Sequence, residues 1–210
     1  NGSGSADREG QVNVAGLEIG LGLRGSLGRF LLTLTLVLGG GPTLAATFDH
    51  GPWDVLLRRH VVVLEGGQAT QVDYAGMAAE RSTLQGYLRV LEGVGQVQFD
   101  AWPREAQLAF LLNAYNAWTV ELILGAYPGL QSIKDLGSLF RSPWKKSFIP
   151  LLGETRSLDD IEHGLIRGSG RYDDPRIHFA VNCASIGCPA LRAEAFVEER
   201  LDAQLAEQTR

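Results

Sequence analysis

Both cysteines of the chain lie in one short segment that could present a reactive thiol. Residues 176–189 read RIHFAVNCASIGCP, and small residues surround Cys183 and Cys188. A turn of small residues leaves backbone N–H groups free to lower the pKa of a thiol and to bind an oxyanion. Two alternatives stay open, namely a structural disulfide or two small buried side chains. If one thiol is functional, we expect it to be Cys183, because Cys188 lies between Gly187 and Pro189 in a turn.

A cysteine nucleophile needs a base, and His163 is the better of two candidates. Asp159 precedes His163 by four residues, so on a helix its carboxylate can orient the imidazole. The same spacing is typical of an ordinary surface ion pair, and that alternative also stays open. His178 precedes Cys183 by five residues in an alternating pattern that predicts a strand over 176–182. In a strand these two side chains would lie about 16 Å apart on opposite faces.

Two asparagines interrupt the apolar stripe of the longest predicted helix. Asn113 and Asn116 are i,i+3 neighbours on or beside the side that we expect to be buried. A buried amide without a partner costs about 1–3 kcal/mol, so we expect Asn113 to bond to a group outside its own helix. Three roles stay open for the two amides: they hold a neighbouring loop, they orient a catalytic side chain, or they bind a substrate amide.

These residues support two hypotheses of function. The first is a cysteine-dependent hydrolase or acyltransferase for peptide or amide substrates, with Cys183, His163 and Asp159 as catalytic residues. The second is a non-catalytic domain that binds a peptide or a small molecule and contains a structural disulfide. The candidate binding residues are Asn113, Asn116, Arg176 and His178, with His163 as a further polar anchor.

The composition and the spacing argue against other classes of partner. A net charge of −5 gives no electrostatic footprint for nucleic acid. A zinc site would have to combine His163, His178, Cys183 and Cys188, whose spacing matches no standard zinc motif. We therefore expect no metal and no other cofactor.

Hydrophobic spacing predicts the elements that position these residues. Helices are expected over 52–60, 77–91, 103–126 and 157–165 and again around 201–205, with Asp100 as the cap of the longest one. A hairpin is expected over 61–74, where two glycines separate two β-prone runs. The pattern predicts a single α+β domain, with helices packed around a small, mainly antiparallel sheet, similar to papain-like or transglutaminase-like folds.

The first 46 residues predict a leader with a secretory signal peptide. Arg24 and Arg29 precede the apolar run Phe30–Leu38, and small residues follow it. The run is too short to cross a bilayer, which takes ~20 residues. We therefore expect a periplasmic or secreted domain over residues 47–210, with no stable membrane insertion after signal removal. The last predicted helix has no cap or breaker before Arg210, so the domain is expected to continue beyond it.

Five segments of the expected domain carry a resemblance to a known family. They are AFLLNAYNAWTVELIL, SIKDLG, PWKK, SLDDIEHGLIR and DPRIHFAVNCASIGCPALR. In this order they resemble the family catalogued as domain of unknown function 547, found in bacteria and plants, over roughly residues 48–210. The resemblance implies no established activity. Its members usually continue past Arg210, which implies a bacterial exported member truncated at its C-terminus. Val197 departs from the family, where a Thr or Ser cap is typical before the last helix.

Overall fold

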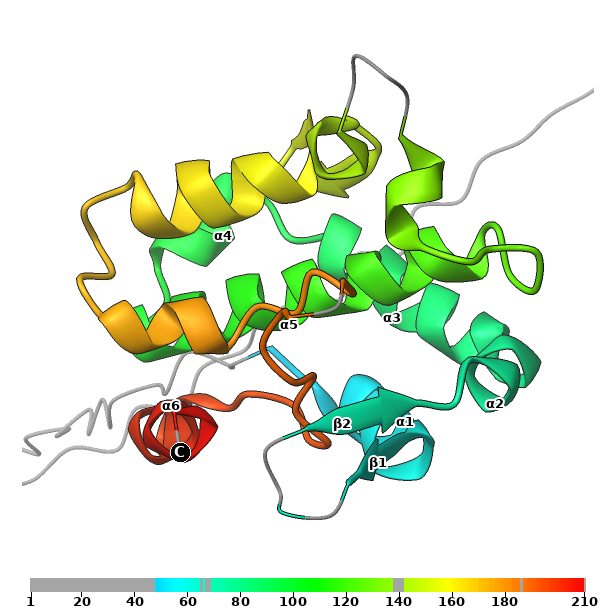
Figure 1. The fold of residues 1–210 in the computed structure, drawn as a ribbon. Coiled ribbons are helices and arrows are strands. Elements are labelled where there is room, and N and C mark those ends of the chain that lie inside the picture. Colours follow the sequence, from blue (N-terminus) through cyan, green and yellow to red (C-terminus); the bar gives the residue numbers. More distant parts are fainter. Residues whose placement is uncertain (1–47, 65, 67–68, 138–141, 186, 210) are drawn as a thin grey trace, which may run out of the picture. The chain divides into compact units, whose positions relative to one another are not determined.

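The computed structural model describes residues 48–64, 66, 69–137, 142–185 and 187–209 (Figure 1). These residues belong to one compact unit, Pro42–Arg210. The predicted leader, residues 1–46, lies outside the described residues. The described part confirms the α+β prediction, because helices predominate and the strands form two small antiparallel hairpins. A papain-like or transglutaminase-like arrangement is not confirmed.

The helix α5, Arg104–Leu124, runs through the middle of the described fold (Figure 1). The helix predicted over 103–126 is confirmed, with Pro103 directly before it and Gly125 directly after it. Sixteen of its 21 residues are buried. They lie on all sides of the helix, so α5 is an interior helix rather than an amphipathic surface helix. Its packing partners include α3 (Arg81–Glu92) and η3 (Asp160–Arg167).

The N-terminal elements confirm one predicted helix and the predicted hairpin. Helix α1 spans Gly51–His60, and strands β1 (Val61–Val63) and β2 (Thr70–Val72) follow it. The two strands are antiparallel, with Val61 opposite Val72.

The helix predicted over 77–91 is in fact two helices, α2 (Tyr74–Ala79) and α3. The break lies at Glu80, whose carboxylate is bonded to Arg59 and His60 of α1. These bonds hold the chain where it leaves the helical conformation.

The prediction that Asp100 caps the longest helix is also wrong. Asp100 is the last residue of the short helix α4, Gln96–Asp100. Its carboxylate is paired with Arg171 at 2.8 Å, and this ion pair lowers the pKa of Asp100. The side chain of Asp100 therefore links α4 to the segment around Arg171 instead of capping α5.

A second hairpin was not predicted. Strands β3 (Ile149–Leu151) and β4 (Glu154–Arg156) pair with each other and not with β1 or β2. Leu152 and Gly153 form the turn, both with positive φ, at 55° and 80°. Two positive φ values are typical of the turns that fit the twist of a tight hairpin. The expected single sheet is therefore two separate two-stranded sheets.

The prediction of a strand over 176–182 is wrong. Pro175–Phe179 form a short 3-10 helix, η4. Asp174 caps it, because its Oδ1 accepts a hydrogen bond from the backbone N of Arg176 at 2.9 Å, and a proline in the first turn favours a helix. The buried residues Ile177 and Val181 are four apart, and Phe179, predicted on the same face, is 43% exposed.

The last predicted helix is present as α6, Leu201–Gln208, and the short 3-10 segment η5, Glu198–Arg200, precedes it. Two further 3-10 segments lie earlier in the chain, η1 (Ile133–Leu136) and η2 (Pro143–Lys145). The chain lacks the hydroxyl cap that is typical of the family before the last helix. Val197 precedes η5, and its backbone N donates to Oε1 of the buried Gln204 at 2.9 Å. An amide one turn into α6 therefore satisfies the backbone N–H of the cap residue, as the Glu or Gln of a capping box does.

The buried pair of His50 and Tyr87 generates a testable pH dependence. His50 Nδ1 lies 2.8 Å from the hydroxyl of Tyr87, and burial lowers the pKa of His50 from 6.5 to about 4, although Asp49 opposes the shift. The unfolded chain therefore binds more protons than the folded chain between these pH values.

As far as His50 determines it, the free energy of unfolding of the protein should be highest above about pH 6.5. It should fall by up to about 3 kcal/mol as the pH drops toward 4. Urea unfolding of the wild type and of His50→Gln at several pH values measures this. The variant should lose the slope between pH 6.5 and 4.5, and equal slopes would contradict the assignment.

Candidate functional site

A loop that crosses α5 is fixed by the two predicted asparagines. Asn113 is 1% exposed. Its Nδ2 donates to the carbonyl of Phe196 at 2.8 Å, and its Oδ1 accepts from the N of Phe196 at 3.0 Å. The prediction that Asn113 is buried and bonded outside its own helix is confirmed.

Asn116 holds the beginning of the same loop. Its Nδ2 donates to the carbonyl of Ala180 at 3.0 Å, and its Oδ1 accepts from the N of Asn182 at 2.9 Å. In both buried amides, the Nδ2 and the Oδ1 therefore each bond to a backbone group. Of the three roles that the sequence left open, the structure shows the first, in which the amides hold a loop.

The loop 182–189 contains both cysteines and is closed twice. Cys183 and Cys188 are joined by a disulfide, with their Cα atoms 5.9 Å apart. The amide of Asn182 closes the same loop, because its Nδ2 donates to the carbonyl of Pro189 at 2.6 Å. Its Oδ1 also accepts from the N of Ala184 at 3.0 Å. In this disulfide form Cys183 carries no thiol.

The carbonyl of Cys183 is also held from outside the loop. The indole Nε1 of Trp144, in η2, donates to it at 3.3 Å. The cysteine loop is thus tied to α5 on one side and to η2 on the other. Its backbone is fixed independently of the disulfide.

The short helix predicted over 157–165 is present, but from Asp160 to Arg167 it is wound as a π-helix, η3. Ser157 and Asp160 cap its start reciprocally, since Ser157 N donates to Asp160 Oδ2 at 2.8 Å and Asp160 N donates to Ser157 Oγ at 3.0 Å. The Ser157 hydroxyl, which donates to Asp160 Oδ2 at 2.7 Å, and then the Ser157 N lower the pKa of Asp160. A π-helix is rare, and such turns are frequent at functional sites.

The π-helical winding creates a contact that an α-helix lacks. Glu162 and Arg167 are five residues apart and form an ion pair at 3.3 Å. Arg167 Nη2 also lies 2.7 Å from Nδ1 of His178 in η4. Arginine only donates, so Nδ1 is the acceptor and the proton of a neutral His178 is on Nε2. Arg167 therefore connects η3 to η4.

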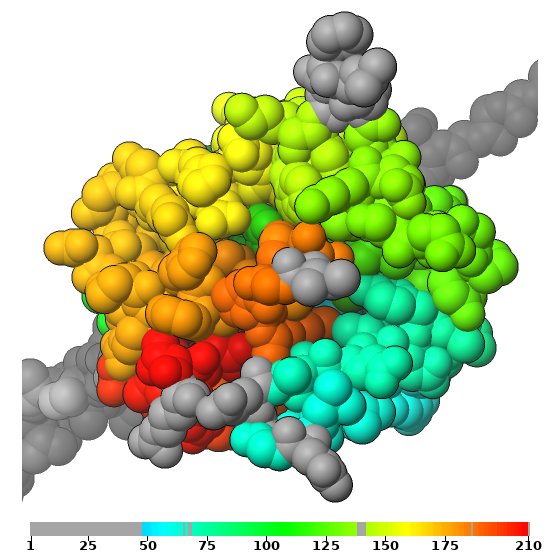
Figure 2. All heavy atoms as spheres, in the orientation of Figure 1, coloured from blue at the N-terminus to red at the C-terminus, as the bar shows by residue number. Residues whose placement is uncertain are grey.

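Tyr115 of α5 lies under this contact. Its burial, and then the nearby Glu162 carboxylate, raise the pKa of Tyr115 well above the usual range. Figure 2 shows a hollow between η3 (yellow) and the cysteine loop (orange), with α5 (green) visible at its bottom. Glu162 and Arg167 were not predicted, because five-residue spacing does not bring side chains together on an α-helix. Tyr115 was not predicted either, since only its contact with η3 distinguishes it from other buried residues of α5.

The predicted pair of Asp159 and His163 is close but loose. Asp159 Oδ1 lies 3.8 Å from His163 Nε2, and the two side chains are 34% and 55% exposed. This distance exceeds that of a hydrogen bond. The geometry is that of a surface ion pair, which was one of the two alternatives.

Arg176 is engaged within the protein. Its guanidinium bonds to Asp174 at 2.7 Å and to Asp202 of α6 at 2.7 Å. Asp174 first, and then Asp202, raise the pKa of Arg176. The side chain links η4 to α6, so its hydrogen bonds are used within the fold.

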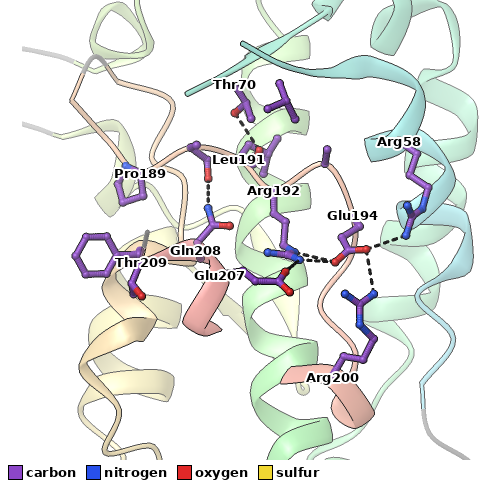
Figure 3. Close-up of a pocket in the computed structure, with 14 residues that line it drawn as sticks. Arg58, Thr70, Pro189, Leu191, Arg192, Glu194, Arg200, Glu207, Gln208 and Thr209 are labelled. Carbon is purple, nitrogen blue, oxygen red and sulfur yellow. Dashed lines mark hydrogen bonds and ion pairs between the residues drawn. The ribbon is translucent and has the colours of Figure 1, made fainter. Parts of the chain in front are cut away.

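The pocket of about 760 Å³ in Figure 3 lies between the β1–β2 hairpin, the segment 189–194 and α6, and Phe179 of η4 also lines it. Its charged side chains pair with one another: Glu194 accepts from Arg58 at 2.9 Å and from Arg200 at 3.2 Å, and Arg192 bonds to both Glu194 and Glu207 (Figure 3). Burial alone would raise the pKa of Glu194, but the arginines and Gln204 lower it to about 2. The pocket wall is thus an internally neutralised network.

In the described ranges no group of three His, Cys, Asp or Glu side chains is placed to hold a metal ion, so His163, His178, Cys183 and Cys188 do not form such a group. None of the helices in these ranges is both long enough and apolar enough to cross a membrane.

The family resemblance is confirmed by comparison with known proteins. The model of the family described as a protein of unknown function, DUF547, matches residues 99–210. This match covers more than half of the 210 residues, and the chain belongs to that family. No curated protein and no solved structure matches the chain.

The end of the π-helix generates a paired test with two glycines. A Cβ on Gly168 would lie 2.5 Å from the carbonyl O of His163, whereas a Cβ on Gly164 would meet nothing within 4 Å. We expect Gly168→Ala to lower the free energy of unfolding by about 1–3 kcal/mol, because backbone cannot move aside cheaply. Gly164→Ala should leave it unchanged or raise it slightly. Urea unfolding of both variants checks this, and equal effects would show that the π-helical winding is not required.

Proposed function

We propose that this member of the DUF547 family is an exported, non-catalytic domain that binds a peptide or a small molecule, with Cys183–Cys188 as a structural disulfide. The observation that carries the proposal is the disulfide itself. It occupies the one side chain that would serve as the nucleophile. A loop fixed by Asn116, Asn182 and Trp144 is also what a preformed binding surface needs, because ordering costs are then met before the ligand binds.

The surface beside η3 is the best candidate for the binding face. The hollow between η3 and the cysteine loop has α5 at its bottom (Figure 2). His178 is fixed by Arg167, which leaves its Nε2–H available as a donor. His163 is half exposed and adds a second imidazole on η3. Two imidazoles on elements that Arg167 connects can bind carbonyl or carboxylate oxygens of a ligand.

Export is part of the same proposal. The basic, apolar and small-residue regions before Thr47 occur in the order of a secretory signal. A periplasmic or secreted location is oxidising, which is the condition under which a disulfide between Cys183 and Cys188 persists. The two parts of the proposal thus support each other.

A second candidate function is a cysteine-dependent hydrolase or acyltransferase that is active in the reduced form. The half-exposed His163 on the π-helix η3 favours it. Because Pro175–Phe179 form η4 and not a strand, His178 is also no longer required to lie on the opposite face from Cys183. In such an enzyme the Cys183 thiolate would attack an amide carbonyl, a histidine would carry the thiol proton to the leaving amine, and water would hydrolyse the thioester.

Counting thiols separates the two functions. Protein secreted by a bacterial host and unfolded in guanidinium without reductant is expected to show no free thiol, and two after reduction. The double variant Cys183→Ser/Cys188→Ser is the matched control and should show none in either state. Two thiols in the unreduced wild type would contradict the binding proposal. Selective iodoacetamide labelling of Cys183 at pH 6, confirmed by peptide mapping, would then support the enzyme.

A further inference from the structure

A smaller pocket lies where the C-terminal half of α5 meets the segments of η1, η2 and β3. Its volume is about 330 Å³, which is at the lower end for small-molecule sites. Its walls are mostly apolar and aromatic. The lining residues used below are Trp118, Glu121, Leu122, Leu136, Lys146 and Phe148.

Two aromatic rings shape this pocket. Trp118 and Phe148 meet edge to face, with ring centroids 5.9 Å apart and planes at 82°. The indole Nε1 of Trp118 is buried and has no hydrogen-bond partner in the described part of the chain. The N–H is not accessible to solvent, so Trp118 contributes the apolar surface of its ring to the pocket wall.

The charge at the pocket is positive. Glu121, the one acidic side chain of the lining, is bonded to Arg81 at 2.8 Å and to Gln85 at 3.2 Å. Its charge is therefore neutralised within the fold. Lys146 forms no ion pair with any described residue, and it is exposed at the pocket.

The lysines of the whole chain gather here. The sequence contains three lysines among its 19 basic residues, namely Lys134, Lys145 and Lys146. The first two lie in η1 and η2, which contact each other. Among the described residues every ion pair uses arginine or histidine, so none of the three lysines is neutralised by one. Asp135 is adjacent to Lys134 and keeps its negative charge, so the three lysines outnumber it. In a chain with a net charge of −5 this is a local cationic patch.

We propose that this pocket binds a small amphipathic carboxylate, with an aromatic ring or a short acyl chain packed against the rings of Trp118 and Phe148. The carboxylate oxygens accept from the ammonium of Lys146, a charge-assisted bond at the mouth of an apolar pocket. The site is separate from the hollow beside η3, and the inference stands whether or not the proposed function does.

The experiment compares 4-phenylbutyrate with 4-phenylbutanol, which share an apolar body and differ in charge. Calorimetric titration of the wild type is expected to show the acid binding at least about tenfold more tightly than the alcohol. Lys146→Gln should weaken the acid by about tenfold and leave the alcohol unchanged. Trp118→Phe, which removes part of the aromatic wall, should weaken both ligands.

The control variant is Arg89→Gln, which removes an exposed basic residue of α3 that does not line the pocket. It should bind the acid as the wild type does. Three results would overturn the proposal: no binding of the acid at millimolar concentration, equal affinity for acid and alcohol, or equal losses in Lys146→Gln and Arg89→Gln. Because Lys146 is on the surface, its variant is expected to fold even if Trp118→Phe does not.

Discussion

The arrangement depends on how a buried helix satisfies the backbone of a loop that crosses it. Helix α5 is buried on all sides, so the segment that lies on it has no access to water for its N–H and C=O groups there. Asn113 and Asn116 supply both a donor and an acceptor to that backbone, at Phe196 and at Ala180 and Asn182. An apolar residue at either position would leave two backbone groups buried and unpaired, which costs far more than the bond itself gains. These two amides therefore determine where the cysteine loop lies.

The same helix also determines the second half of the candidate site. Tyr115 lies between the two asparagines in sequence, and Glu162 of η3 lies close enough to raise its pKa. The wider π-helical turn places Arg167 over Glu162 and within reach of His178. Three segments that are far apart in the sequence thus meet over a short stretch of α5. The contacts that join these three segments are the kind that the proposed preformed binding surface requires.

The sequence predicted what local periodicity controls and failed where tertiary contacts decide. Helices α1 and α5, the first hairpin and the burial of Asn113 follow from spacing, from prolines and glycines, and from the cost of an unpaired amide. The strand over 176–182 was wrong because its apolar residues fit either a strand or a helix, and Asp174 with Pro175 decides for the helix. The second hairpin was missed because Leu152, unlike Asn or Asp, gives no signal for a positive φ. The winding of η3 was not predictable, since five-residue spacing becomes a contact only after a π-helix has formed.

The central claim is that the asparagine amides of α5 hold the backbone of the crossing loop. Amide hydrogen exchange at Phe196 and Asn182 tests it most directly, because each of these N–H groups donates to an asparagine side chain and not to secondary structure. The account predicts that both amides exchange as slowly as the interior amides of α5, since they can open only when the packing of the core opens. Exchange of either amide at the rate of an exposed loop would contradict it.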